Sequence, residues 1–226
     1  MELTYYGHSC FLIKTGETGI LFDPFISGNP LARHIELERI NADYILLSHA
    51  HGDHLADAAA IAKQKNAKIV AQPEITDWYA KQNLNDSIQM NIGGTVKLGN
   101  ASVKMVVAIH SSSLPDGTYG GHPAGFVMKA EGKTIYFAGD TALTYDMKII
   151  GEQFEVDHAL LPVGGHYTMD AADALIAAEW VKAKNVIAMH YDSFPPIKIE
   201  KETVAKEAEK VGKALMFLEI GQTITL

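Results

Sequence analysis

The 226-residue chain is predicted to form an α/β fold, a four-layered αββα sandwich of two pseudo-symmetric halves within a single domain, residues 1–226. Three observations predict this architecture. Each half opens with short apolar segments separated by turn residues, which are typical of β-hairpins. Each half closes with strand–helix–strand units, and the two halves resemble each other in sequence. Two such halves can pack their sheets face to face and cover the outer faces with helices.

The likeness between the halves keeps a nearly constant separation along the chain. A Gly-His pair shortly before an apolar strand occurs at residues 7–8 and again at residues 121–122. Further on, Asp43 stands before an apolar strand in the same way as Asp157. The matched positions lie 114 residues apart in both comparisons, so a duplicated unit explains the pattern better than chance likeness between amphipathic strands.

Individual elements follow from hydrophobic periodicity and turn residues. Strands are expected at residues 2–6, 10–14, 19–23, 124–130 and 133–138, with further strands in 88–108 around glycine turns at 93–94 and 99–100. Helices are expected at about 57–66, 73–82, 170–183 and 199–211. Two of these helices begin at residues suited to N-capping, Asp57 and Asp170.

Composition narrows the partners of the chain. Its 47% hydrophobic and 20% charged residues are those of an ordinary globular protein. A net charge of −8 argues against nucleic-acid binding, but it is compatible with a small substrate, which could itself be anionic. A homo-oligomer is also possible. The single cysteine, Cys10, excludes an internal disulfide, and no secretory signal or membrane-spanning apolar run is present. We therefore expect a cytoplasmic protein that binds no membrane and acts on a small molecule.

The most informative segment is His-Ala-His-Gly-Asp-His at residues 49–54. Imidazole and carboxylate groups suit zinc, and also manganese or iron. In extended backbone the side chains of His49 and His51 point to the same side. Gly52 then allows a turn that brings Asp53 and His54 to a second position nearby. One strand-to-helix loop is therefore predicted to serve two metal ions.

Two metal ions need more than four protein ligands, and later strand ends offer them. Three polar side chains stand where an apolar run gives way to a loop: His110, Asp140 and His190. Each of them alone has a structural interpretation, as a hydrogen-bonded surface histidine or a turn residue. Together with residues 49–54 they form a complete donor set, which favours a metal centre.

This donor set resembles the metal centre of the metallo-β-lactamase superfamily, and the resemblance covers the whole chain. It implies an αββα fold with internal pseudo-symmetry. It also implies one metal ion on His49, His51 and His110, a second on Asp53, His54 and His190, and a bridging Asp140. Three segments are similar to a group of uncharacterised cytosolic hydrolases, related in turn to ascorbate-6-phosphate lactonases: residues 6–9, 22–24 and 164–169.

The resemblance implies a metal-dependent hydrolase. Two divalent ions, zinc in preference to manganese or iron, would generate a bridging hydroxide that attacks an ester, lactone, amide or phosphodiester of a small molecule. Superfamily members with glutamate in place of the second histidine tend to be iron-dependent oxidoreductases, whereas this chain has His51. Two alternatives stay open: a metal-binding protein without turnover, and an iron-dependent redox enzyme on the same fold.

Other polar residues receive weaker assignments. Asp53 is predicted to orient the nucleophile as well as to bind metal. His122 and His166 lie in glycine-rich loops, where each could donate a proton or contact substrate, or simply be exposed. Asp23 could orient a ligand imidazole or serve as a structural cap, and the two roles are about equally supported.

Three further residues are left without a role. His8 could lie behind the metal site. Arg33 and His34 could bind an anionic group of the substrate, although a solvated surface is the simpler interpretation. The substrate, the native metal and the oligomeric state do not follow from the sequence.

Overall fold

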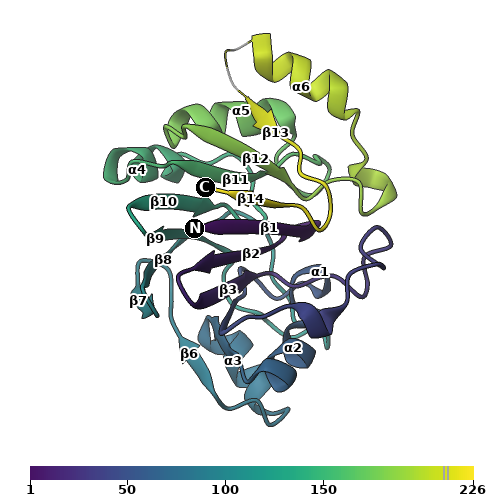
Figure 1. The fold of residues 1–226 in the computed structure, drawn as a ribbon, viewed down its shortest axis with the longest axis vertical. Coiled ribbons are helices and arrows are strands. Elements are labelled where there is room, and N and C mark those ends of the chain that lie inside the picture. Colours follow the sequence, from purple (N-terminus) through teal and green to yellow (C-terminus); the bar gives the residue numbers. More distant parts are fainter. Residues whose placement is uncertain (211, 213) are drawn as a thin grey trace.

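A computed structural model describes residues 1–210, 212 and 214–226. Two seven-stranded sheets lie face to face, and helices cover the outer face of each sheet (Figure 1). The predicted four-layered αββα sandwich is therefore confirmed. In the described part of the chain, no helix combines the length and the apolarity that crossing a lipid bilayer requires.

The first sheet has the strand order β14-β1-β2-β3-β4-β5-β6. Pairing is antiparallel from β14 to β3 and parallel from β3 to β6. Its strands are β1 (Glu2–Gly7), β2 (Cys10–Thr15), β3 (Thr18–Phe22), β4 (Tyr44–Leu46), β5 (Lys68–Ala71), β6 (Ser87–Gln89) and β14 (Thr223–Thr225).

The second sheet repeats this arrangement in the order β7-β8-β9-β10-β11-β12-β13. Pairing is antiparallel from β7 to β10 and parallel from β10 to β13. Its strands are β7 (Thr95–Leu98), β8 (Ala101–Val107), β9 (Ala124–Ala130), β10 (Lys133–Phe137), β11 (His158–Pro162), β12 (Asn185–Met189) and β13 (Leu215–Met216). The two halves therefore share one topology, as their sequence likeness predicts.

Hydrogen bonding repeats the symmetry at the level of single residues. Asp43 precedes β4, and its side-chain Oδ2 accepts a hydrogen bond from the backbone N–H of Gly19 at 2.8 Å. In the other half Asp157 precedes β11, and its Oδ2 accepts from the N–H of Thr134 at 2.9 Å. Each aspartate also donates its own backbone N–H to the carbonyl of the same partner residue. These paired contacts fix the start of the parallel strands in both sheets.

Phenylalanines from both halves pack between the sheets. Phe11 and Phe22 belong to the first sheet, Phe126 and Phe137 to the second, and all four are fully or almost fully buried. The ring centroids of Phe22 and Phe137 lie 5.0 Å apart, and those of Phe22 and Phe126 lie 6.1 Å apart. Burial of such large apolar rings dominates the energetics of a core, so this cluster joins the two sheets near the centre of the sandwich.

The described residues form six α-helices: α1 (Gly52–Leu55), α2 (Ala58–Lys65), α3 (Pro73–Ala80), α4 (Asp146–Gln153), α5 (Ala171–Trp180) and α6 (Lys201–Lys210). Short 3₁₀ helices lie at Leu37–Arg39 and Pro195–Ile197. The helices predicted at 57–66, 73–82, 170–183 and 199–211 correspond to α2, α3, α5 and α6. Residue 211, at the end of the last prediction, lies outside the described residues.

Of the two predicted N-cap residues, Asp170 caps its helix with its side chain and Asp57 does not. The side chain of Asp170 caps α5 by accepting a hydrogen bond from the N–H of Asp173. Asp57 stands at the start of α2, but its side chain makes no capping bond. Its carboxylate instead accepts hydrogen bonds from the N–H groups of Ile26 and Ser27, and from the Ser27 hydroxyl. The N–H groups of this loop after β3 have no partner in a sheet, and the Asp57 carboxylate satisfies them.

The pKa of Asp157 gives a prediction about acid stability. Burial opposes ionisation of this carboxyl, but the Lys184 ammonium at 2.9 Å and the Thr134 N–H outweigh it and lower the pKa. The folded pKa lies below the unfolded value of about 3.9, so the carboxylate stabilises the fold above that pH, and the contribution is lost as pH falls through the folded pKa. At pH 7 the free energy of unfolding of Asp157→Asn should be about 1 kcal/mol below wild type.

Urea unfolding of both proteins from pH 7 downward measures this difference, which should shrink below about pH 4. Glu152→Gln, at an exposed position on α4, is the control and should match wild type throughout. If the difference in free energy of unfolding between Asp157→Asn and wild type is the same in acid as at neutral pH, ionisation of Asp157 does not contribute to stability.

Candidate metal centre

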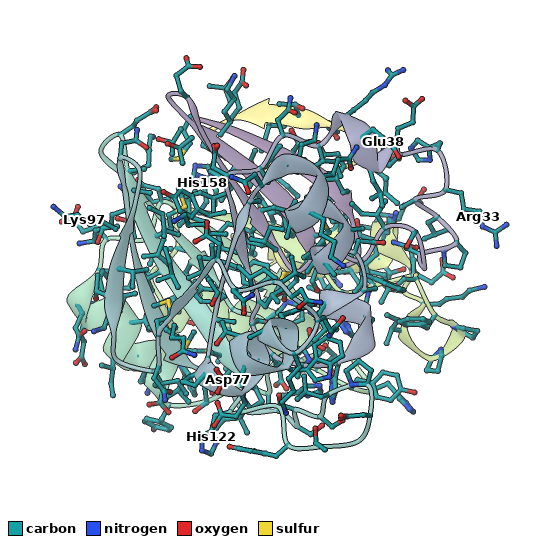
Figure 2. The ribbon with its side chains drawn as sticks, turned by 90° about the horizontal axis from the view of Figure 1, so that it is seen from below. Arg33, Glu38, Asp77, Lys97, His122 and His158 are labelled. Atoms are coloured by element: carbon teal, nitrogen blue, oxygen red, sulfur yellow. The ribbon has the colours of Figure 1, made fainter. Side chains whose placement is uncertain are left out.

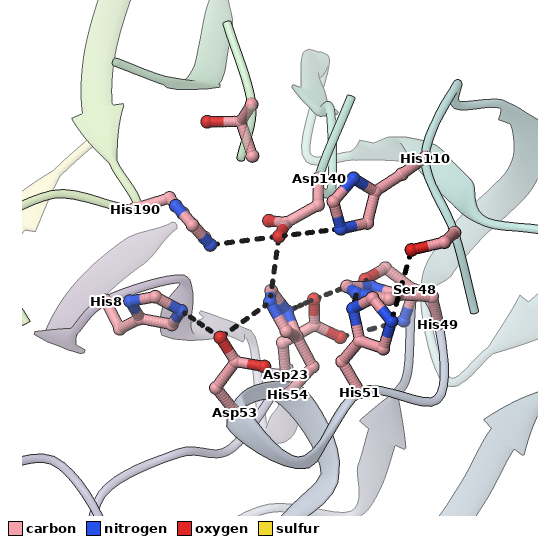
Figure 3. Close-up of polar contacts among 12 residues, drawn as sticks. His8, Asp23, Ser48, His49, His51, Asp53, His54, His110, Asp140 and His190 are labelled. Atoms are coloured by element: carbon pink, nitrogen blue, oxygen red, sulfur yellow. Dashed lines mark hydrogen bonds and ion pairs between the residues drawn. The ribbon is translucent and has the colours of Figure 1, made fainter. Parts of the chain in front are cut away.

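Polar side chains from both sheets meet at one edge of the sandwich, where strands end (Figure 3). They follow six strands, three in each sheet: His8 after β1, Asp23 after β3, His49 after β4, His110 after β8, Asp140 after β10 and His190 after β12. Loops at strand ends are free of the hydrogen-bonding pattern of a sheet, and they commonly carry functional groups on a rigid base.

The loop at residues 49–54 changes backbone conformation within the motif. His51 is extended, with φ −71° and ψ 148°, and the four-residue helix α1 begins directly after it at Gly52. His49 and His51 therefore lie side by side as predicted, with 3.0 Å between His49 Nε2 and His51 Nδ1. The helical turn directs Asp53 toward His8, whereas His54 lies next to both donor groups, with its ring centroid 4.2 Å from that of His49.

The first group of donors consists of His49, His51 and His110. One nitrogen from each ring lies within 4.8 Å of the others. The ring of His110 stands nearly perpendicular to the other two, with centroids 5.2 Å from His49 and 5.1 Å from His51. Three imidazole nitrogens at such separations can surround one divalent ion.

The carboxylate of Asp140 lies at the centre of the site. Its Oδ2 is 2.9 Å from His190 Nε2, 3.3 Å from His54 Nε2 and 3.6 Å from His110 Nε2. Burial alone would raise the pKa of Asp140, but the neighbouring His190 and His54 outweigh burial and hold it well below its usual value. An ionised Asp140 therefore faces imidazoles from both donor groups, which is the geometry expected of a bridging ligand.

Gly139 allows Asp140 to take this position. Its φ of +64° lies in the left-handed region, which glycine adopts without steric cost. A Cβ atom at this position would lie 2.5 Å from the carbonyl oxygen of Ala124. The chain therefore turns sharply at the end of β10, close against β9.

The second group of donors consists of His8, Asp53, His54 and His190. Oδ2 of Asp53 lies 3.3 Å from His8 Nε2 and 4.0 Å from His54 Nε2. The three imidazoles are buried, whereas the side chain of Asp53 is 26% exposed. Burial opposes ionisation of Asp53, but His8 and His54 outweigh it and lower its pKa. Asp53 is thus an ionised carboxylate on the solvent side of the site.

Asp23 holds His54 from behind. Its Oδ2 accepts a hydrogen bond from His54 Nδ1 at 2.8 Å, and its Oδ1 accepts one from the Ser48 N–H at 2.8 Å. The Ser48 hydroxyl also lies 2.9 Å from His49 Nδ1. A histidine that donates one ring N–H to a carboxylate presents the lone pair of its other nitrogen to a metal. Of the two roles considered for Asp23, this geometry supports orientation of a ligand imidazole.

Orphaned polar atoms indicate that the donor set fits metal ions. Among the described residues, His54 Nε2 and Asp140 Oδ1 are buried without a hydrogen-bond partner. Burial opposes protonation of His54, but Asp140 and Asp23 outweigh it and raise its pKa well above the usual value. Buried polar atoms normally find partners, and a divalent cation would satisfy these atoms in place of a proton.

The remaining candidates lie outside the cluster. His122 and His166 are both exposed, and in the described residues no hydrogen bond or ion pair joins either to the seven candidate ligands. Figure 2 shows His122 at the molecular surface, and its backbone is bonded to the side chain of Gln72. His166 is at the tip of a loop that is closed by a hydrogen bond from the Gly165 N–H to the Met169 carbonyl. The N–H of Met169 donates to the carbonyl of Thr141, the residue next to Asp140.

Arg33 and His34 lie on the exposed loop between β3 and the first 3₁₀ helix (Figure 2 labels Arg33). His34 lines a cavity of about 700 Å³ together with His8, Tyr191 and Lys198. This cavity lies beside the metal centre, since His8 belongs to both.

The sequence pattern assigns no definite role to His8 and none to Ser193, although both lie at the site. His110 and His190 directly follow apolar runs, whereas Gly7 separates His8 from the strand predicted at residues 2–6. Ser193 carried no such signal, because its contact with His8 joins residues 185 positions apart.

The contact between Asp23 and His54 gives a prediction about metal affinity. Asp23→Asn keeps the shape of the side chain but removes the charge that fixes the ring of His54. We expect metal affinity to fall by about 10–100-fold, measured by competition with a chromophoric chelator. Asp57→Asn removes another buried carboxylate, one that bonds only loop residues, and should leave metal affinity unchanged. Equal losses in both variants would assign Asp23 a purely structural role.

Comparison with known proteins agrees with this geometry. A family model described as "Beta-lactamase superfamily domain" matches residues 2–190. A UPF0173 metal-dependent hydrolase of Flavobacterium johnsoniae is 50% identical, and the match covers all of both chains. A relative of the same name from Thermus thermophilus is 45% identical over 100% of this chain and 99% of its own.

Among solved structures, Igni18, described as a novel metallo hydrolase from the archaeon Ignicoccus hospitalis, is 36% identical with a TM-score of 0.90. The match covers 100% of this chain and 97% of that one. The family model covers most of the chain, and full-length relatives are 45–50% identical to it, so the family membership is shown. The chain therefore belongs to the β-lactamase superfamily and is one of its metal-dependent hydrolases.

Proposed function

We propose that the chain hydrolyses an ester, lactone or phosphodiester bond of a small molecule at a centre of two divalent metal ions. The observation that carries the proposal is the position of Asp140, whose carboxylate faces imidazoles from both donor groups within 3.6 Å. A carboxylate shared between two donor groups is the arrangement that holds two ions close together.

In this proposal the donors divide into two sets around Asp140. One ion is held by His49, His51 and His110, and the other by Asp53, His54 and His190. Zinc is favoured because imidazole and carboxylate are its usual ligands, with manganese or iron as alternatives. When bound, the ions supply a water of lowered pKa for attack at neutral pH and positive charge that polarises the carbonyl or phosphoryl oxygen.

The protein's own groups orient the reactants. Asp53 is ionised and partly exposed, so its carboxylate can accept a hydrogen bond from the attacking water and hold it in line. His166 stands on a loop anchored beside Asp140, and His122 on the loop that carries Gly120 close to Ala50. Each is proposed to contact substrate or to protonate the leaving group. The net charge of −8 supports a small molecule rather than a nucleic acid as substrate.

The number of ions and the reaction class can be tested together. Protein loaded with zinc, manganese or iron should contain two ions per chain by elemental analysis. It should hydrolyse at least one generic ester, lactone or phosphodiester. Asp53→Ala should lower kcat by about 10²–10⁴-fold, and Asp140→Asn should weaken binding of both ions.

Two results would count against the hydrolase centre. One is metal-loaded protein that turns over none of these substrates, with Asp53→Ala affecting only thermal stability. The other is a chain that binds one ion and cycles it between oxidation states, which would favour the redox alternative.

The proposed roles of the loop histidines have a separate test. His166→Asn and His122→Asn should leave the metal content unchanged, since neither residue contacts the candidate ligands. A proton donor should show a kcat loss of about 10²-fold or more that grows as the leaving group becomes more basic. A variant that raises only KM marks a substrate contact, and unchanged kinetics in both variants would remove both residues from the mechanism.

A further inference from the structure

His8 lies inside the metal centre but belongs to neither of the two proposed ligand sets. It is 1% exposed, and its Nε2 lies 3.3 Å from Oδ2 of Asp53. Figure 3 shows its ring beside Asp53 and pointing toward it. The ring centroids of His8 and His190 are 4.2 Å apart. A buried imidazole so close to two proposed ligands needs a function.

The ring of His8 is fixed from several sides. Its Nδ1 is 2.5 Å from the hydroxyl of Ser193. The rings of Phe25 and Phe194 pack edge-on against it, at centroid distances of 5.4 and 5.6 Å. Its carbonyl oxygen accepts hydrogen bonds from the N–H of His190 and the hydroxyl of Tyr5. The contacts of Ser193, Phe25 and Phe194 restrict rotation of the ring, and the bonds to the carbonyl oxygen hold the backbone.

The backbone of His8 is also strained. Its φ is +54°, in the left-handed region that side-chain-bearing residues rarely adopt. Such conformations cost free energy and persist where the surrounding structure enforces them. This backbone conformation directs the ring of His8 between Ser193, on the loop after β12, and Asp53, on helix α1.

Asp53 has few other supports. It lies on a helix of only four residues, and its side chain is 26% exposed. In the described part of the chain His8 is its nearest charged or polar side-chain partner, since His54 Nε2 is 4.0 Å away. Without His8 the carboxylate could rotate toward solvent. By contrast, Asp140 is buried among three imidazoles and needs no such support.

We propose that Ser193 and His8 form a positioning relay that fixes the carboxylate of Asp53 at the second metal ion. In this relay the Ser193 hydroxyl donates to His8 Nδ1. The N–H at Nε2, which is buried without a hydrogen-bond partner at 3.3 Å from Asp53 Oδ2, turns slightly to donate to that oxygen. This leaves the remaining lone pairs of the Asp53 carboxylate for the ion and for the attacking water. The proposal rests on the two-metal centre proposed above, and it makes His8 a positioning residue rather than a ligand.

The test compares variants that keep or remove the N–H donor at the distance of Nε2. His8→Asn tolerates a positive φ but is too short to reach Asp53, whereas His8→Gln carries an amide N–H near the position of Nε2. Ser193→Ala removes the other end of the relay. His158→Asn is the matched control, because it shortens a buried histidine on β11 that has no contact with the candidate ligands.

Stepwise affinities for cobalt(II), with the visible absorption spectrum of each bound ion, supply readouts that do not depend on activity. His8→Asn should weaken one of the two ions by about 10–100-fold and leave the other unchanged. His8→Gln should restore most of this loss, and Ser193→Ala should cause a smaller loss at the same ion. His158→Asn should alter neither affinity.

A double-variant experiment separates the relay from direct ligation. If His8 acts through Asp53, adding His8→Asn to Asp53→Asn causes no further loss of affinity. A further loss would show that His8 binds the ion itself and would overturn the relay. Equal weakening of both ions, or no weakening, in His8→Asn would also overturn it. Wild-type protein that binds a single ion would instead contradict the two-metal centre.

Discussion

The buried carboxylate of Asp140 imposes the constraint around which the site is organised. Removing an unpaired charge from water costs several kcal/mol, so positive or hydrogen-bonding groups must surround it. Three imidazole nitrogens supply this compensation, and they come from α1 and from the ends of β8 and β12. Because β8 and β12 belong to the second sheet and α1 follows β4 of the first, Asp140 gains all three imidazoles only when both sheets are in place.

The same edge of the sandwich stores local strain. His8, Asp23 and His190 all have positive φ values, although none is a glycine. Each such residue costs about 1–3 kcal/mol, which the rest of the fold must offset. The phenylalanine cluster of Phe11, Phe22, Phe126 and Phe137 and the paired strands on either side of it supply a rigid base. Other non-glycine residues with positive φ, such as Asn66 and Glu131, lie at helix ends and turns, but the three at this edge stand where side chains of the site converge.

The sequence predicted the architecture well because both signals it used are periodic: the strand pattern and the repeat between the halves. It also placed seven candidate ligands where strands end, and carboxyl ends of parallel strands share an edge. Their role as ligands stays a prediction, and the sequence assigns no definite role to His8, which lies among them. Helix α4 was missed because Gly151 interrupts its pattern; a Cβ there would lie 2.1 Å from the carbonyl of Trp180. The contacts of Asp57 with residues 26–27, and of His8 with Ser193, depend on packing between distant segments, which no local pattern encodes.

The division of the proposed ligands between two sheets has a thermodynamic consequence. Ions that bind only the folded arrangement draw the folding equilibrium toward it by mass action, by about 4 kcal/mol for each site when free metal exceeds its Kd a thousandfold. That is comparable to the stabilisation expected from a disulfide closing a loop of about 100 residues. The chain has one cysteine and cannot form such a cross-link within itself. In this protein the catalytic centre would also hold the two sheets together, and the free energy of unfolding would rise with the concentration of free metal.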